Sequence, residues 1–207
     1  MILKSKICGI SDSATLKYLV NHNYPPKFIG FITNYKKSKR YVEFNKLKEL
    51  TNMNNGKINF VSVLVDPDDK ILEKIKNLKF DYLQLYDVDP NRTKFIKKKY
   101  NTKIISALTV KNKADVEAYK SYQDISDIIL FDGKGYEKSI GFDHSLLDNL
   151  PNTITKMVAG NLKIDNIPKL NNSDFLIDLS GSLENEEGKK DLQKIDLFLK
   201  NIKKNEN

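Results

Sequence analysis

The stretch Lys6-Ile7-Cys8-Gly9-Ile10 decides how the fold of this chain begins. It completes a short apolar segment that starts at Ile2, and the polar residues Ser11-Asp12-Ser13 follow directly. An apolar run that breaks at a glycine and continues into a capping aspartate predicts a strand followed by a helix. Cys8, the only cysteine of the chain, therefore stands at the carboxyl end of a first strand. In α/β folds this end of a strand is where ligands bind.

The same strand-then-helix pattern continues along the rest of the chain. Short apolar runs rich in β-branched and aromatic residues predict further strands at 28–32, 60–65, 82–85, 103–108, 128–131, 156–159 and 174–178. Amphipathic or capped segments between them predict helices at 12–21, 43–51, 91–100, 113–121 and 189–203, with others opening at Asp66-Pro67 and near Asp143. Short connections between such units indicate a parallel sheet with right-handed crossovers.

Eight such units predict an α/β fold, specifically a (βα)8 or TIM barrel. We expect one domain over residues 1–207, with a short polar tail from about 203. An open doubly wound sheet is the alternative, but its phosphate loop is normally a glycine-rich first turn, and residues 8–12 lack that glycine spacing. With 40% hydrophobic residues, the chain can bury a core without metals or disulfides.

Charge and composition exclude several classes of partner. The net charge is +8, but the lysines are spread along the chain, and Arg40 and Arg92 are the only arginines, so no nucleic-acid partner is expected. A positive field still favours an anionic metabolite. A single cysteine, no signal peptide and no apolar run of about 18 residues predict a cytoplasmic protein without a membrane partner.

Two residues at predicted strand ends are candidates for acid–base chemistry. Asp132 follows a fully apolar strand, where partial desolvation raises a carboxyl pKa and keeps a proton available; it could instead cap a helix. Cys8 could act as a base if a nearby cation lowers its pKa, or it could be a small buried hydrophobe. Strand alternation places Lys6 on the same side as Cys8, which leaves open whether Lys6 is its partner or an interior salt-bridge group.

Small residues follow the seventh and eighth predicted strands. They are Gly160-Asn161 and Ser180-Gly181-Ser182. Barrels often present backbone N–H groups to a phosphate at these two loops, because small residues allow close approach. Ser-Gly-Ser alone is also compatible with an ordinary turn.

Six short motifs stand in order at the predicted strand ends and loops. They are residues 6–10, 28–31 followed by 38–42, 83–85, Asp132 with Phe142-Asp143, 159–162, and 178–180 with Glu184 and Lys190-Asp191. In this order and at these strands they resemble the phosphoribosylanthranilate isomerase family, and the similarity covers nearly the whole chain.

The resemblance implies an Amadori rearrangement in tryptophan biosynthesis, which converts N-(5-phosphoribosyl)anthranilate into 1-(2-carboxyphenylamino)-1-deoxyribulose 5-phosphate. No cofactor or metal is implied, and the partner is a small phosphorylated substrate. By the family pattern, Asp132 is the general acid and Cys8 the base, and Arg40 holds the anthranilate carboxylate, which suits a planar guanidinium fork. The resemblance further implies that Gln84 and Asp178 bind the substrate, with Asp178 near the ribose, and that the phosphate is bound by Gly160, Asn161, Ser180, Gly181 and Ser182.

The chain also departs from the family pattern at several loops. Tyr86-Asp87 replaces His-Gly, Asn161 replaces a glycine, Ser180-Gly181-Ser182 replaces Ser-Ser-Gly, Tyr136–Ser139 replaces a glycine-rich segment, and His144 replaces a tryptophan. These changes favour a second hypothesis, a diverged barrel that binds or isomerises another phosphorylated metabolite. The chain is expected to be a monomer or a homodimer.

Overall fold

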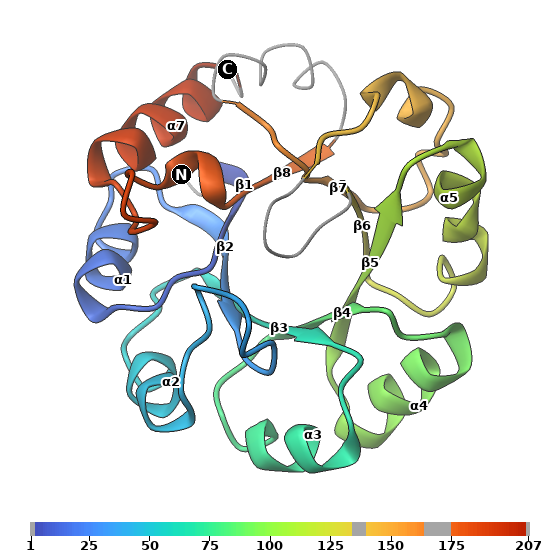
Figure 1. Cartoon of the computed structure of the whole chain (residues 1–207), viewed down its shortest axis with the longest axis horizontal. Coiled ribbons are helices and arrows are strands. Elements are labelled where there is room, and N and C mark those ends of the chain that lie inside the picture. The colour runs from blue at the N-terminus through green and yellow to red at the C-terminus, as the bar shows by residue number, and fades with distance from the viewer. Residues whose placement is uncertain (1–2, 134–139, 164–174, 206–207) are drawn as a thin grey trace.

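The computed structural model describes residues 3–133, 140–163 and 175–205, and in it the strands form a closed parallel barrel. Each strand pairs in parallel with the next, and β8 pairs with β1 to complete the ring. Figure 1 shows this ring viewed from one end, with the helices arranged outside it. The (βα)8 prediction is confirmed, and the open doubly wound sheet is excluded.

The strands of the barrel follow the predicted order. They are β1 (Leu3–Cys8), β2 (Pro26–Ile32), β3 (Asn59–Val65), β4 (Tyr82–Tyr86), β5 (Lys103–Val110), β6 (Ile128–Gly133), β7 (Lys156–Val158) and β8 (Phe175–Leu179). The α-helices are α1 (Ser13–Val20), α2 (Phe44–Thr51), α3 (Asp69–Ile75), α4 (Pro90–Tyr100), α5 (Lys113–Glu117) and α7 (Leu192–Asn205). Three 3-10 helices complete the described elements: η1 (Ala118–Ser121), η2 (His144–Leu147) and η4 (Gly181–Leu183).

Several boundaries differ from the predicted ones for local reasons. β1 ends at Cys8, because Gly9 adopts φ 79° and the N–H groups of Gly9 and Ile10 both donate to the Gly30 carbonyl. α3 begins at Asp69 instead of at Pro67, because the Asp68 carboxylate accepts from the Ile71 N–H and caps the helix there.

Other differences concern helix type and length. The segment predicted as one helix over 113–121 is α5 followed by η1, and the helix expected near Asp143 is the 3-10 helix η2. α7 begins at Leu192 and continues to Asn205, into the expected polar tail. The predictions for Tyr136–Ser139 and for Asp174 lie outside the described residues.

Two separate apolar layers hold the barrel together. The larger lies between the strands and the surrounding helices. The smaller fills the barrel interior with side chains from every strand, among them Phe28, Val61, Ile105, Leu130, Met157 and Leu176. These inward side chains fill the barrel below its carboxyl end, so a ligand can bind only at that end. No helix in the described part of the chain combines the length and apolar composition that crossing a bilayer requires.

Candidate active site

A cavity of about 550 Å³ opens at the carboxyl ends of the strands. The structure brings nine of the ten predicted site residues to it: Cys8, Arg40, Asp132, Gly160, Asn161, Asp178, Ser180, Gly181 and Ser182. Its remaining lining includes the apolar side chains of Ile32, Val63 and Val65 from β2 and β3. One wall is therefore apolar and the other is built from small residues and charged groups, as a substrate with a ring and a phosphate would require.

Gln84 is the predicted site residue that the structure does not bring to the cavity. Its side chain is fully buried in β4, and neither amide atom meets a hydrogen-bond partner among the described residues. Gln84 and Tyr86 point to the same face of the strand, but Gln84 lies two residues, or about 7 Å, deeper in the barrel. Tyr86 lines the cavity and separates Gln84 from it.

Cys8 lies at the floor of the cavity beside a buried lysine. A methyl group on the Gly30 Cα would meet Cys8 Sγ at 3.0 Å and Lys6 Nζ at 3.2 Å, so both atoms crowd against this glycine of β2. Burial raises the pKa of the Cys8 thiol above its usual value, and the Lys6 ammonium acts in the opposite direction. Glycine at position 30 gives the thiol and the ammonium room to lie side by side, and any side chain here would have to displace one of them.

Lys6 is also paired with Asp178 across the seam where β1 meets β8. Lys6 Nζ donates to Asp178 Oδ2 at 2.7 Å, and both side chains are buried. Burial lowers the pKa of Lys6, but Asp178 and Cys8 more than offset this, so its pKa lies above the usual value and the ammonium stays charged. Asp178 Oδ1 accepts no hydrogen bond from the described residues, and Asp178 lines the cavity. Oδ1 therefore has an unused capacity to accept a hydrogen bond.

Asp132 ends the inward face of β6 and meets a tyrosine from β4. Tyr86 Oη donates to Asp132 Oδ2 at 2.7 Å. Burial raises the pKa of the Asp132 carboxyl to about 6, while Tyr86 lowers it. A carboxyl with this pKa is partly protonated near neutral pH and can donate a proton.

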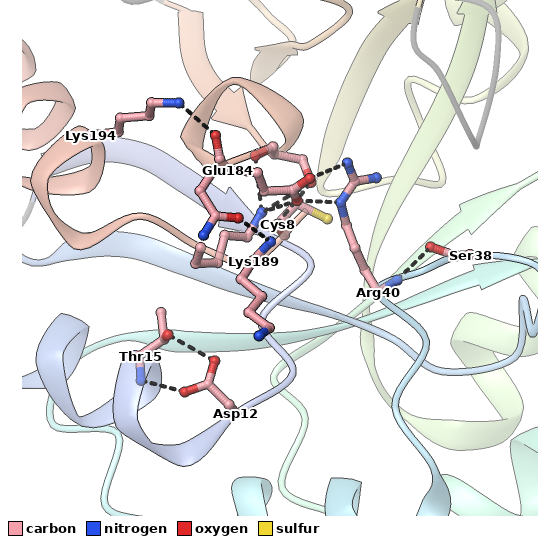
Figure 2. Close-up of polar contacts among 11 residues, drawn as sticks. Cys8, Asp12, Thr15, Ser38, Arg40, Glu184, Lys189 and Lys194 are labelled. Carbon is pink, nitrogen blue, oxygen red and sulfur yellow. Dashed lines mark hydrogen bonds and ion pairs between the residues drawn. The ribbon is translucent and has the colours of Figure 1, made fainter. Parts of the chain in front are cut away.

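Arg40 lies in the loop after β2 and reaches towards the loop after β8. Arg40 Nε and Nη2 donate to the two Glu184 oxygens at 2.5 and 2.8 Å, as Figure 2 shows. Lys190 Nζ shares Glu184 Oε1 at 2.8 Å and donates to the Ser180 carbonyl at 2.9 Å. Two cations thus share one carboxylate, which leaves this side of the cavity with a net positive charge suited to an anionic group.

The two small-residue loops lie close to these charged groups. Gly160 and Asn161 adopt φ 95° and 52°. A side chain at position 160 would lie 2.5 Å from the Gly133 nitrogen and 3.4 Å from Asp132 Oδ1. Only glycine therefore allows the loop after β7 to pack against the end of β6. In the loop after β8, Ser180 Oγ donates to the Cys8 carbonyl at 3.0 Å, which ties this loop to β1.

The arrangement suits proton transfer on an anionic sugar. It offers a carboxyl that can give a proton, a thiol beside an ammonium that can take one, and cations with small loops for charged groups. Within the described residues, no group of three or more His, Cys, Asp or Glu side chains is placed to hold a metal ion.

Comparison with known proteins places the chain in one family. The family model for N-(5'-phosphoribosyl)anthranilate (PRA) isomerase matches residues 5–201. The chain belongs to the phosphoribosylanthranilate isomerase family. The N-(5'-phosphoribosyl)anthranilate isomerases of Brucella canis and Brucella suis are each 32% identical to it over 213 residues, which cover 98% of this chain and 95% of theirs.

Solved phosphoribosylanthranilate isomerases have the same fold. The Thermotoga maritima enzyme superimposes with a TM-score of 0.85 at 26% identity, covering 99% of this chain and 100% of that one. A structure of a phosphoribosylanthranilate isomerase with reduced 1-(o-carboxyphenylamino)-1-deoxyribulose 5-phosphate gives a TM-score of 0.83 at 25% identity, with the same coverage.

The sequence does not reveal the role of three groups at this site. In the sequence Tyr86 is a departure from the family pattern, and Glu184 and Lys190 are parts of a motif. The open question about Lys6 is answered by the structure, since Lys6 is both an ion-pair partner of Asp178 and a neighbour of Cys8. The strand alternation that put Lys6 and Cys8 on one face was the available signal.

The buried pair of Lys6 and Asp178 predicts a stability effect. Lys6→Met should lower the free energy of unfolding by about 3–5 kcal/mol, because it leaves the buried Asp178 carboxylate without its cation. Urea unfolding followed by circular dichroism measures this. The double variant Lys6→Met/Asp178→Asn should recover a large part of the loss. An equal loss in both variants would show that packing of the lysine stem, and not the ion pair, accounts for the effect.

Proposed function

We propose that this chain isomerises N-(5'-phosphoribosyl)anthranilate to 1-(2-carboxyphenylamino)-1-deoxyribulose 5-phosphate, with Asp132 as general acid and Cys8 as general base. The observation that carries the proposal is that these two side chains line one cavity with Arg40 and both small-residue loops. The reaction is the Amadori rearrangement of tryptophan biosynthesis.

The first step assigned to the site is ring opening. Asp132 donates its proton to the furanose ring oxygen, the bond between that oxygen and C1 breaks, and the nitrogen lone pair forms a Schiff base at C1. A pKa of about 6 supports this role, because the carboxyl holds a proton more readily than a surface aspartate and still releases it easily.

The second step is removal of the C2 proton. The Cys8 thiolate takes this proton and becomes a thiol, and the C2 electrons move towards the Schiff base to give the enol, which rearranges to the ketone. Burial keeps the pKa of the Cys8 thiol above its usual value, and the Lys6 ammonium beside the sulfur, which favours the thiolate, supports the assignment. Asp178, which lines the cavity, would lie near the ribose.

Charged groups position the two ends of the substrate. Arg40 would receive the anthranilate carboxylate, and the apolar wall of Ile32, Val63 and Val65 would cover the ring. The phosphate would lie against Gly160-Asn161 and Ser180-Gly181-Ser182, with Lys190 behind Ser180. A crystal structure with the reduced product analogue tests both placements, and a phosphate bound elsewhere refutes the second.

The proposal also concerns the cellular location and the oligomeric state of the protein. We place it in the cytoplasm, since its substrate is a phosphorylated metabolite and its single cysteine forms no internal disulfide. One solved relative is described as a dimeric phosphoribosylanthranilate isomerase. For this chain, sedimentation equilibrium would distinguish the monomer from the homodimer.

Substrate turnover tests the function directly. N-(5'-phosphoribosyl)anthranilate made in situ should lose its fluorescence when the purified protein is added, and the gene should restore growth to a tryptophan auxotroph that lacks this step. Absence of turnover by pure, folded protein would refute the assignment. Binding of the product analogue without turnover would instead support the diverged-barrel hypothesis.

Arg40→Lys tests the substrate carboxylate site. Lysine keeps the charge but cannot donate two parallel hydrogen bonds, so KM should rise roughly tenfold with a smaller change in kcat. Arg92→Lys is a matched control, because Arg92 pairs with Asp69 outside the cavity and should leave both constants unchanged. Parental kinetics in Arg40→Lys would place Arg40 in a structural role with Glu184.

A further inference from the structure

The hydrogen bond between Tyr86 and Asp132 links the proposed general acid to a residue that departs from the family pattern. Tyr86 occupies the position where the family pattern reads His, and its hydroxyl donates to Asp132 Oδ2 at 2.7 Å. Tyr86 is 7% exposed, and its ring packs in the barrel interior among the apolar side chains of the inner layer. The ring is therefore held by packing, and the hydroxyl has a fixed position at the edge of the cavity.

The direction of this hydrogen bond is set by chemistry. Burial raises the pKa of the Tyr86 phenol well above 10, and the nearby carboxylates act in the same direction. Tyr86 therefore stays protonated at every pH at which the enzyme works, and it donates. A donor to a carboxylate stabilises the charged form, so the effect on Asp132 is opposite in sign to that of burial.

We propose that Tyr86 is a positioning residue that orients the Asp132 carboxyl and adjusts the pH range in which Asp132 acts as an acid. The proposal rests on the proposed function, because it takes Asp132 to be the acid. The Tyr86 hydrogen bond fixes Oδ2 at the edge of the cavity. The other oxygen, Oδ1, lies towards Gly160, at 3.4 Å from the position of a methyl group there, which sets the plane of the carboxyl at the cavity.

Other groups around Asp132 also act on its pKa, but each has a smaller effect than Tyr86. Asp178 on β8 raises the pKa of Asp132, while Lys6 on β1 and the backbone N–H of Gly133 lower it. Tyr86 is the strongest influence that opposes burial. Removing its hydroxyl alone leaves the Lys6–Asp178 pair intact, so the change can be attributed to one hydrogen bond.

Tyr86→Phe tests the proposal because it removes the hydroxyl and keeps the packed ring. The break that Asp132 produces in the pH dependence of kcat/KM, near pH 6 in the parent, should move up by about one unit, and kcat should fall roughly tenfold because the carboxyl loses its fixed orientation. Tyr82→Phe is the matched control. Tyr82 lies on the same strand with its ring edge-on to Phe28, away from the cavity lining, and its variant should leave the break in place.

A second measurement is independent of turnover. The 13C carboxyl signal of Asp132, identified by its loss in Asp132→Asn, should titrate near pH 6 in the parent and about one unit higher in Tyr86→Phe. An unchanged titration in folded Tyr86→Phe protein would overturn the proposal, whatever happens to the rate. If the parent is inactive but Asp132 still titrates about one unit higher in Tyr86→Phe, the proposed function is refuted, while the effect of Tyr86 on the Asp132 carboxyl stands.

Discussion

Asp132→Asn is expected to lower kcat by roughly two to four orders of magnitude, the usual contribution of general acid–base catalysis. Asparagine has the shape of aspartate and can still accept the Tyr86 hydrogen bond through its amide oxygen, but it has no proton to give to the ring oxygen. KM and binding of the reduced product analogue should therefore change little. Steady-state kinetics together with analogue titration separate the two effects.

The same variant should not weaken the fold. The pKa of Asp132 is raised to about 6 in the folded protein, so between the unfolded pKa near 3.8 and pH 6 rising pH reduces the stability that this group confers. Above pH 6 the folded protein carries a buried charge that asparagine removes, and the free energy of unfolding should be unchanged or higher. Asp143→Asn changes the exposed cap of the 3-10 helix η2, which follows β6; it is the control and should keep parental kcat. Near-parental kcat in Asp132→Asn would mean that Asp132 is structural.

Cys8→Ser should produce a loss of similar size, roughly two to four orders of magnitude in kcat, because a serine hydroxyl is far too weakly acidic to form the base. Serine is slightly smaller than cysteine and should fit beside Lys6 and Gly30, so fold and analogue binding should survive. Deuterium at C2 distinguishes this variant from Asp132→Asn. Proton removal from C2 becomes slower in Cys8→Ser, so its isotope effect should exceed that of Asp132→Asn. Equal isotope effects in the two variants would argue against this division of roles.

The single cysteine allows an independent check of the base. Any alkylation by iodoacetamide occurs at Cys8, so one equivalent of label should abolish turnover, and the product analogue should protect against it. The rate of labelling follows the thiolate fraction. Since burial raises the pKa of Cys8, labelling should be slow at pH 7 and should accelerate as the pH rises above 9. Full turnover by labelled protein would show that Cys8 is not the base and is only a small buried hydrophobic residue.

Much of the fold could be predicted because the composition of each strand reflects which of its faces are buried. The run Phe28–Ile32 is continuously apolar because helices cover one face and the barrel interior the other. Asp12 was a recognisable helix cap, and its carboxylate accepts from the backbone N–H and hydroxyl of Thr15. The start of α3 was not predicted correctly, because Pro67 and Asp68 both suit a helix start and only the observed hydrogen bond distinguishes them.

The site was predictable in position but not in its contacts. Cys8 and Asp132 could be placed at the mouth because the strand ends converge there. Strand alternation gives the face of a residue but not its depth, so Gln84 could not be distinguished from Tyr86 as a cavity residue. Ion-pair partners that are far apart in the chain could not be predicted either. Asp178 is 172 residues from Lys6, and Glu184 is 144 residues from Arg40.

The ion pair between Lys6 and Asp178 has a consequence for biosynthesis. Lys6 leaves the ribosome near the start of translation, whereas Asp178 belongs to the last strand. Until β8 emerges, the lysine that is to be buried has no counter-ion, and a closed interior would be unfavourable. The nascent chain should therefore keep its first strand accessible to solvent and to chaperones for most of synthesis. Completion of the barrel and assembly of the acid–base site then become a single late event, so a chain truncated before β8 is a substrate for proteolysis and not a partial enzyme.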